Sequence, residues 1–245
     1  MKKKEILILG GTSDIGIAIA NRFAQDQFDV HLAGRDSDYL ARVATDINIR
    51  RDVHVKHSVF DATEFNSHDD FYSSISEKPE ICACVFGYLG NQNAAQELWS
   101  EANKIIGANY TGAVSILNRV AEDYARVGSG TIIGISSVAG DRGRQSNYIY
   151  GSAKAGFTAY LSGLRNRLYN KGVNVITVKP GFVRTRMTDG LHLPAALTVS
   201  AEKVAESVYQ AFKRKKDVVY ISALWWPIMT IISMLPEALF KRLKL

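Results

Sequence analysis

Glu5-Ile-Leu-Ile-Leu9-Gly10-Gly11-Thr12-Ser13-Asp14-Ile15-Gly16 is the stretch that decides the fold of this chain. Its first five residues form a short apolar run typical of a buried parallel strand. A glycine-rich turn follows, and residues 17–25 have helical periodicity. Glycines let a backbone approach a phosphate, and a helix N-terminus offers free N–H groups. An ordinary tight turn is the alternative, but the position after the first strand favours a dinucleotide cradle.

The length and charge of the chain narrow its class. Its 245 residues suit one large α/β domain with a substantial core. The net charge of +6 is modest and concentrated, since residues 213–245 hold seven lysines and arginines against two acidic residues. We therefore expect no nucleic-acid partner. Met1–Lys4 is basic but runs into the first strand without the apolar segment of a signal peptide, so we expect a cytoplasmic protein.

Alternating strands and helices follow the first unit. Strands are predicted at residues 5–9, 28–33, 53–59, 81–86, 130–135, 173–178 and 217–221. Helices are predicted at residues 14–26, 37–48, 94–106, 109–127 and 148–171. This alternation predicts an α/β fold of the Rossmann type, with a doubly wound parallel sheet of about seven strands and helices on both faces. We expect residues 1–222 to form this single domain and residues 223–245 to form an apolar helical tail.

The cysteines and histidines do not suggest a metal site. Cys82 and Cys84 lie in a predicted strand, and we expect their thiols to point to opposite faces and to pack in the core. The five histidines lack the spacing of metal ligands. We therefore expect no bound metal.

Tyr150 and Lys154 are four residues apart in a predicted helix. This spacing places a phenol and an ammonium on one helix face. A nearby cation stabilises a phenolate, so we expect Lys154 to lower the pKa of Tyr150 toward neutrality. Such a tyrosine can exchange a proton with a substrate oxygen. The pair alone is common by chance, and its weight depends on the motifs around it.

Those motifs lie where predicted strands end. The glycine turn follows the first strand, Ser136-Ser137 follows the fifth, and Pro180-Gly181 follows the sixth. The carboxyl ends of parallel strands meet at one edge of a sheet, where ligands bind near the switch in strand order. We therefore expect these motifs to share one site.

The motifs together resemble those of the short-chain dehydrogenase/reductase family. In chain order they are Gly10–Gly16, Asn109, Ser137, Tyr150 with Lys154, and Pro180-Gly181. The resemblance covers residues 5 to about 190 and implies hydride transfer between NAD(P) and a carbonyl or alcohol. It implies that Tyr150 is the acid in reduction and the base in oxidation, and that Lys154 holds the nicotinamide ribose. Ser137 would bind the substrate oxygen, and Asn109 would support a relay water by bending its helix.

The resemblance also implies a set of dinucleotide contacts. They are Gly10, Thr12, Ser13, Asp14, Ile15, Gly16, Arg35, Asp61, Gly87, Tyr150, Lys154, Pro180, Gly181, Val183 and Thr185. Asp14 departs from the family pattern, which has glycine there, and we expect its carboxylate to cap N–H groups at the helix start. Gly34 stands where an acidic residue would bind the ribose of NAD, and Arg35 suits the 2′-phosphate of NADP. NADP(H) is therefore favoured, while Asp36 leaves NAD(H) open.

A narrower resemblance concerns the substrate. Phe86–Gly90, Ser137–Arg144 and Gly181–Met187 are similar to segments of reductases that act on a keto-sugar carried on a polyprenyl phosphate, converting a 2-keto-ribose to arabinose. Four arginines near the predicted site suit a substrate phosphate, although surface ion pairs are the alternative for each of them. They are Arg142, Arg144, Arg184 and Arg186. Turnover of a soluble ketone or alcohol and dinucleotide binding without turnover are the other functions considered, and the intact proton-handling residues argue against the second.

The tail and the substrate loop leave several possibilities open. Residues 218–235 are almost uncharged, contain Trp225 and Trp226, and precede a basic end at residues 241–244. Prolines interrupt the segment too much for a transmembrane helix. It would lie in a membrane interface at the inner face of the plasma membrane, or form a dimer-interface or active-site flap helix. We expect a substrate loop at about residues 182–200, a small-molecule or lipid-linked sugar substrate, and, by family analogy, a homodimer or homotetramer.

Overall fold

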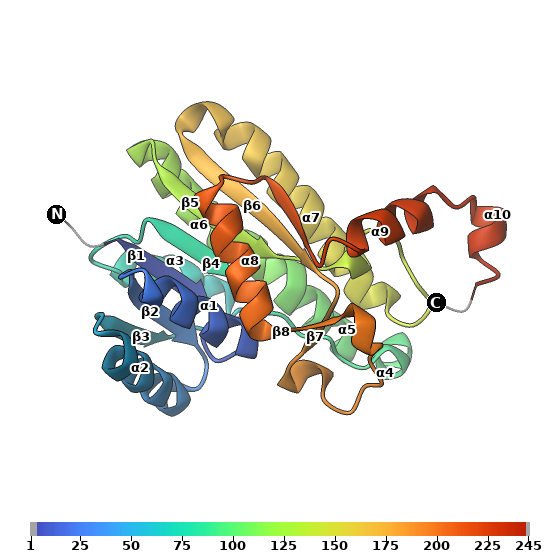
Figure 1. Ribbon diagram of the computed structural model, residues 1–245, viewed down its shortest axis with the longest axis horizontal. Coiled ribbons are helices and arrows are strands. Elements are labelled where there is room, and N and C mark those ends of the chain that lie inside the picture. The colour runs from blue at the N-terminus through green and yellow to red at the C-terminus, as the bar shows by residue number, and fades with distance from the viewer. Residues whose placement is uncertain (1–3, 244–245) are drawn as a thin grey trace.

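The computed structural model describes residues 4–243, so the outermost residues of the predicted domain and tail lie outside it. Seven parallel strands form one sheet in the order β3-β2-β1-β4-β5-β6-β9 (Figure 1). They are β1 (Glu5–Leu9), β2 (Asp29–Gly34), β3 (Val55–Val59), β4 (Ile81–Cys84), β5 (Gly130–Ile135), β6 (Val173–Pro180) and β9 (Val218–Ile221). All seven predicted strands are confirmed, with small shifts at their ends.

Helices cover both faces of this sheet. One face packs against α1 (Asp14–Gln25), α2 (Ser37–Arg51) and α8 (Ala201–Lys213). The other packs against α3 (His68–Ser74), α6 (Gly112–Val127) and α7 (Tyr148–Leu168). Neighbouring residues of a strand point to opposite faces, so Ile6 and Ile8 enter the first core while Leu7 and Leu9 enter the second. This double burial explains why the strands read as continuous apolar runs.

The cysteines illustrate the same alternation and correct one prediction. Cys82 and Cys84 are buried free thiols, as expected. The prediction that they point to opposite faces is wrong, because residues two apart in a strand share a face, and both thiols lie in the core beneath α6 and α7. Within residues 4–243, no group of three or more histidine, cysteine or acidic side chains is placed to hold a metal ion.

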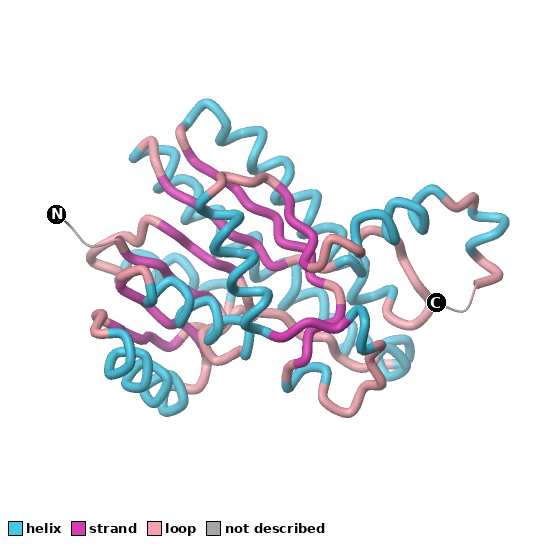
Figure 2. Tube along the Cα trace, in the orientation of Figure 1, coloured by secondary structure: helices cyan, strands magenta, loops and turns pink. Residues whose placement is uncertain are grey.

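Figure 2 shows the helices and loops along the chain, and two helices near the site differ from their predicted form. The segment predicted at residues 94–106 divides into α4 (Gln92–Glu97) and α5 (Trp99–Ile106), because Leu98 between them is extended. The helix predicted from residue 109 begins as a π-helical turn, Gly107–Thr111, that continues into α6. A π-turn inside a helix bends it and is frequent at functional sites.

Two C-terminal segments, residues 182–200 and 225–240, lie outside the main sheet. β7 (Phe182–Arg184) and β8 (Thr198–Ser200) pair as a small second sheet within the predicted substrate loop. α9 (Trp225–Met234) and α10 (Glu237–Phe240) extend away from the main sheet (Figure 1). No helix among the described residues has the length and apolar character needed to cross a bilayer.

Candidate active site

The glycine turn lies at the switch in strand order, between β1 and its two neighbours β2 and β4. Gly10 has a φ of +100°, and a Cβ there would lie 2.6 Å from the nitrogen of Phe86. A Cβ on Gly16 would lie 2.3 Å from the carbonyl oxygen of Gly10. Ser13 caps α1 by accepting a hydrogen bond from the Gly16 nitrogen (3.0 Å), and its hydroxyl donates to the Gly10 oxygen (2.7 Å). The turn is therefore held in shape and can use no side chain at these two positions.

A cleft of about 660 Å³ opens above this turn. Nine of the predicted dinucleotide contacts line it: Gly10, Thr12, Ser13, Asp14, Ile15, Arg35, Asp61, Gly87 and Thr185. Phe60, Phe86 and Met187 line it as well and were not among the predicted contacts. Phe60 and Phe86 each lie just after a strand that ends at this edge, which is the signal that would have found them. The remaining predicted contacts, Gly16, Tyr150, Lys154, Pro180, Gly181 and Val183, are not on the lining of this cleft.

Asp14 plays a different part from the one predicted. Ser13 rather than Asp14 caps the helix. The Asp14 carboxylate accepts hydrogen bonds from the backbone nitrogen of Arg186 (2.7 Å) and from its Nε (2.8 Å). The arginine also lies over the ring of Tyr39, 5.3 Å from its centroid. The departure from glycine at residue 14 thus ties the segment after β7 to the glycine turn across the cleft.

Arg35 and Asp61 face the same cleft from β2 and from the segment after β3. Arg35 is exposed on the lining. Burial would raise the pKa of Asp61, but hydrogen bonds from Thr63 and attraction to Arg35 outweigh it and lower that pKa. The cleft therefore presents an accessible guanidinium, a group that pairs well with phosphates, beside an ionised carboxylate.

Asn109 lies in the π-helical turn and is 1% exposed. Its Nδ2 donates to the carbonyl oxygens of Tyr88 (2.6 Å) and Ile105 (2.8 Å). Its Oδ1 accepts a hydrogen bond from the Tyr88 nitrogen (3.3 Å). The side chain thus joins the segment after β4 to the bent helix, at the place where the sequence predicts a bend.

The predicted catalytic pair, Tyr150 and Lys154, occupies the first turns of α7. Lys154 is 4% exposed, and its Nζ donates to the carbonyl oxygen of Ile135 (3.0 Å) and lies 5.8 Å from the centroid of the Tyr150 ring. Burial raises the pKa of Tyr150 to about 12, although its hydrogen bond with Ser137 opposes the rise. Burial also lowers the pKa of Lys154 to about 8. The expectation that the cation brings the phenol toward neutrality is therefore wrong for this state, because desolvation of the phenolate is the larger effect.

A phenol that keeps its proton at neutral pH is still suited to act as the acid in reduction, one of the two predicted reactions. Tyr150 keeps its proton and is hydrogen-bonded to Ser137, so it can donate that proton to a substrate oxygen. Ser137 stands at the end of β5 and also accepts a hydrogen bond from the Ala139 nitrogen (3.1 Å). The structure thus brings together the tyrosine, the serine and the lysine that the sequence predicts.

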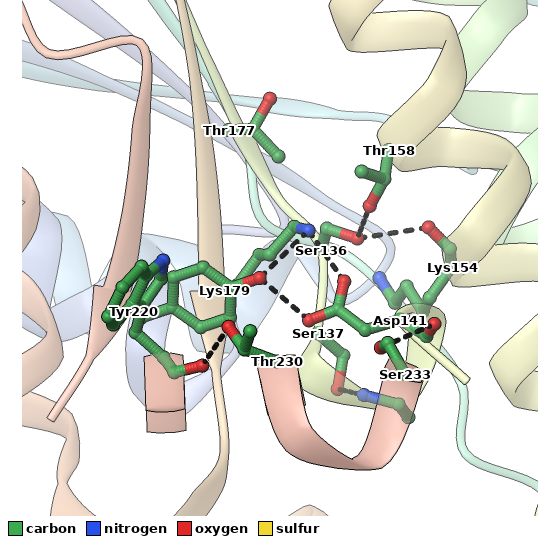
Figure 3. Close-up of polar contacts among 12 residues, drawn as sticks. Ser136, Ser137, Asp141, Lys154, Thr158, Thr177, Lys179, Tyr220, Thr230 and Ser233 are labelled. Carbon is green, nitrogen blue, oxygen red and sulfur yellow. Dashed lines mark hydrogen bonds and ion pairs between the residues drawn. The ribbon is translucent and has the colours of Figure 1, made fainter. Parts of the chain in front are cut away.

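A polar network that the sequence did not reveal supports this region (Figure 3). The Nζ of Lys179 lies 2.5 Å from one carboxylate oxygen of Asp141, and the Tyr220 hydroxyl donates to the other (2.9 Å). The Ser136 hydroxyl lies within hydrogen-bonding distance of Thr158 Oγ1 (2.7 Å). Lys179 directly precedes Pro180, so the network fixes the segment after Ser137 to the ends of β6 and β9. It involves residues 79 positions apart, which no local pattern can predict.

The tail packs on this network. Trp225 and Met229 are 4% and 1% exposed and form one cluster with Val138 and, at its edge, Phe182. A Cβ on Gly181 would lie 1.9 Å from the indole nitrogen of Trp225. One face of α9 is therefore part of the domain, directly behind the segments that carry the serine and the substrate loop.

The four predicted substrate arginines differ in their surroundings. The Nη2 of Arg142 donates to Glu237 in α10 (2.6 Å), and its guanidinium lies over the ring of Phe240. Arg186 pairs with Asp14, as described above. Two of the four are thus engaged by the tail and by the glycine turn.

The other two arginines have no ion-pair partner among the described residues. Arg184 is exposed on β7. Arg144 is partly buried, its Nε has no hydrogen-bond partner, and burial lowers its pKa. Arg144 is therefore the one of the four whose charge is both desolvated and unpaired.

The chain is similar in sequence to known proteins. Residues 4–194 match the short chain dehydrogenase family. The chain is 36% identical to an uncharacterized oxidoreductase of Mycobacterium tuberculosis, over 97% of this chain and 96% of that protein. It is 33% identical to an uncharacterized oxidoreductase of Streptomyces coelicolor, over 98% of this chain and 96% of that protein.

Solved structures agree with the fold at lower sequence identity. A short-chain dehydrogenase from Sphingobium yanoikuyae in complex with NADPH has a TM-score of 0.82 at 23% identity, over 96% of this chain and 97% of that chain. A 7beta-hydroxysteroid dehydrogenase has a TM-score of 0.84 at 18% identity, over 98% of this chain and 96% of that chain. The family match spans most of this chain and includes the glycine turn, Ser137, Tyr150 and Lys154. The chain therefore belongs to the short chain dehydrogenase family of NAD(P)-dependent oxidoreductases.

Proposed function

We propose that the protein uses NADPH to reduce the carbonyl of a keto-sugar carried on a polyprenyl phosphate. The observation that carries the reductase part is the geometry of the Tyr150 hydroxyl, which is hydrogen-bonded to Ser137 and lies near the buried Lys154. NADPH, when bound, supplies the hydride. Reduction of a carbonyl develops negative charge on its oxygen, and a positioned acid and a second donor stabilise that charge.

Each residue of the site has a part in this proposal. Tyr150 donates its proton to the substrate oxygen, and Ser137 donates a hydrogen bond to the same atom. Lys154 holds the nicotinamide ribose and, as a cation, eases the loss of the tyrosine proton. Asn109 holds the bent helix beside them and supports a relay water.

The proposed preference for NADPH rests on Arg35 and Gly34. No carboxylate occupies residue 34, and Arg35 lies accessible on the cleft lining, where a guanidinium pairs well with a 2′-phosphate. The Sphingobium relative, which shares the fold, was solved with NADPH. NAD(H) is the second candidate, because Asp36 follows directly.

The proposed substrate class rests on three features. Segments 86–90, 137–144 and 181–187 resemble decaprenylphosphoryl-2-keto-ribose reductase. Arg144 offers an unpaired guanidinium beside α7, which suits an anionic group. The outer face of α9 is apolar, which suits a lipid-borne substrate. Oxidation or reduction of a soluble alcohol or ketone is the alternative.

The function is tested by oxidation of NADPH and NADH with a synthetic farnesylphosphoryl 2-keto-pentose, in parallel with a panel of soluble ketones. We expect turnover of the farnesylphosphoryl compound with a preference for NADPH. Turnover of the soluble ketones alone would assign the alternative substrate class. Binding of NADPH without turnover of any compound would instead indicate a dinucleotide-binding module.

The outer face of α9 leads to a prediction about membranes. Trp226, Ile231 and Met234 are 62%, 65% and 78% exposed, opposite the face that packs on the domain, and Lys241 and Arg242 follow. An apolar helix face beside basic residues binds the surface of anionic bilayers. We propose that the protein docks peripherally on the inner face of the plasma membrane, and we expect the full chain to float with vesicles that contain phosphatidylglycerol.

Serine substitution at all three outer positions should abolish this flotation. The matched control changes three residues that are equally exposed elsewhere, Ile49, Val59 and Tyr169, to serine and should float like the wild type. Equal flotation of the two triple variants would contradict the docking proposal. Because Trp225 and Met229 stay in place, the inner packing of α9 is preserved in both.

We also propose a homodimer or homotetramer formed through the long helices α6 and α7. The proposal rests on analogy within the family. Light scattering of the purified chain gives the mass directly, and a monomer would contradict it.

A further inference from the structure

Three residues at or beside the start of α7 carry buried polar atoms that have no hydrogen-bond partner. Within the described residues, eight buried side-chain nitrogen or oxygen atoms have no hydrogen-bond partner. Three of them belong to Gln92 (Nε2), Arg144 (Nε) and Asn147 (Oδ1). Buried polar atoms in proteins are nearly always paired, so each unpaired one requires an explanation. Three in one small region indicate a missing common partner.

Backbone contacts bring these three residues together at the start of α7. The nitrogen of Asn147 donates to the carbonyl oxygen of Arg144 (3.1 Å), which closes a turn directly before the helix. The nitrogen of Ile149 donates to Oε1 of Gln92 (3.1 Å), which places the free amide group of Gln92 beside the residue that precedes Tyr150. The three residues thus lie at or beside the start of α7, next to the segment that carries Tyr150.

Asn147 is unusual for its position. It is the residue before the first turn of α7, where an asparagine side chain normally caps the helix. Here its side chain makes no capping hydrogen bond. Its Oδ1 therefore has no partner within the protein.

The guanidinium of Arg144 also lacks an ion-pair partner among the described residues. The one carboxylate that attracts it is Asp141, and that carboxylate is already held by Lys179 and Tyr220. By contrast, Arg142 and Arg186 each have their own carboxylate partner. A partly buried cation without a partner is costly, and a bound anion would remove the cost.

We propose that Gln92, Arg144 and Asn147 form the substrate subsite, in which Arg144 binds a phosphate ester while the two amides bind sugar hydroxyls. The proposal rests on the proposed function, because it places the substrate at Tyr150. A free sugar phosphate and a lipid-linked sugar phosphate both carry this phosphate ester and these hydroxyls. Two amide groups beside one cation suit a hydroxylated, anionic carbonyl compound better than an apolar ketone.

Binding of three probes to the full chain, with and without NADP⁺, tests the subsite. They are a farnesylphosphoryl 2-keto-pentose, ribulose 5-phosphate and ribulose, measured by calorimetry or, where weak, by ligand-observed NMR. We expect Arg144→Met to weaken binding of phosphorylated probes by about 10- to 100-fold and to leave ribulose unchanged. Arg144→Lys should recover part of the loss, and Arg50→Gln, a surface arginine on α2, should behave like the wild type.

Asn147→Ala is the sharper test of hydroxyl recognition, because this side chain has no hydrogen bond within the protein to lose. We expect it to weaken binding of all three sugars by about 3- to 10-fold, and unchanged binding would remove Asn147 from the subsite. For Arg144→Met, a loss of binding confined to the farnesyl probe would identify a lipid-linked substrate. A loss with both phosphorylated probes would identify a site that also accepts free sugar phosphates.

Three results would overturn the subsite. In the first, the wild type binds neither phosphorylated probe. In the second, Arg144→Met binds both phosphorylated probes normally. In the third, Arg144→Met loses affinity for ribulose to the same extent as for the phosphorylated probes. Failure of the proposed function is a separate result, in which the wild type binds a phosphorylated probe through Arg144 but oxidises no NADPH with it.

Discussion

Replacing Tyr150 with phenylalanine should lower kcat by about 100- to 10,000-fold, the range expected when a positioned general acid is removed. The substitution deletes only the hydroxyl. The ring can keep its packing against Ile105 and Ala102 in the small core beside α5. NADPH affinity should therefore change little, and the loss should appear in kcat. Steady-state kinetics together with NADPH titration by fluorescence measure the two effects separately.

Tyr148 provides the matched control. It lies in the same turn of α7, but its side chain is 43% exposed. Tyr148→Phe should retain nearly the full rate, which excludes a general effect of removing a phenol from this helix. A Tyr150→Phe enzyme that keeps its rate within about tenfold would contradict the role of Tyr150 as the acid.

Lys154 should make NADPH binding depend on pH. Burial lowers the pKa of Lys154 to about 8 in the empty site, and the ammonium is the form that donates to Ile135 and would donate to the ribose. Binding therefore favours the protonated form and raises this pKa. Below pH 8 the lysine is already protonated and affinity should be flat. Above pH 8 the empty protein has lost this proton, and affinity should fall toward about tenfold per pH unit.

Lys154→Met should remove that slope and weaken NADPH binding by about 10- to 100-fold at pH 7. Turnover should fall at least as much, because the residue also supports proton donation by Tyr150. The uncharged side chain suits a buried position, so the variant should fold, and circular dichroism checks this. Fluorescence titrations from pH 7 to 9.5 and calorimetry in buffers of different ionisation enthalpy measure the slope and the proton uptake. An unchanged slope in the variant would contradict the assignment.

The main sheet and the glycine turn were predictable because local patterns encode them. A strand buried on both faces must be apolar throughout, and Ile6–Leu9 meets that requirement in sequence. The tight turn at Gly10 and Gly16 leaves no room for a side chain, so glycine itself reports the turn. Helical spacing placed Tyr150 and Lys154 on one face of α7, and the surrounding motifs gave the pair its weight.

Long-range pairings were not predictable. Asp14 reads as a helix cap, yet its partner Arg186 is 172 positions away. Arg142 reads as a substrate contact, yet it pairs with Glu237 in the tail, 95 positions away. The identity of a residue states its charge but not which opposite charge the fold brings to it.

Burial is the other quantity that local patterns miss. The spacing of Tyr150 and Lys154 correctly indicated a tyrosine and a cation on one helix face, but the sign of the pKa change depends on how much water each group loses. In the folded chain both groups are desolvated, which raises the pKa of Tyr150 and lowers the pKa of Lys154, so that each charged form is disfavoured. The break at Leu98 likewise has no signal in the local sequence pattern.

Transfer of deuterium from NADPH labelled at C4 of the nicotinamide tests the central claim most directly. Each of the two C4-deuterated forms is incubated with the full chain and the farnesylphosphoryl 2-keto-pentose or the ketone panel, and the product is examined by mass spectrometry and NMR. The account predicts one deuterium on the new carbinol carbon from one of the two forms only, and a strong reduction of this product with Tyr150→Phe. Bound NADPH that delivers deuterium to no carbonyl compound, or equal product from the Tyr150→Phe variant, would contradict it.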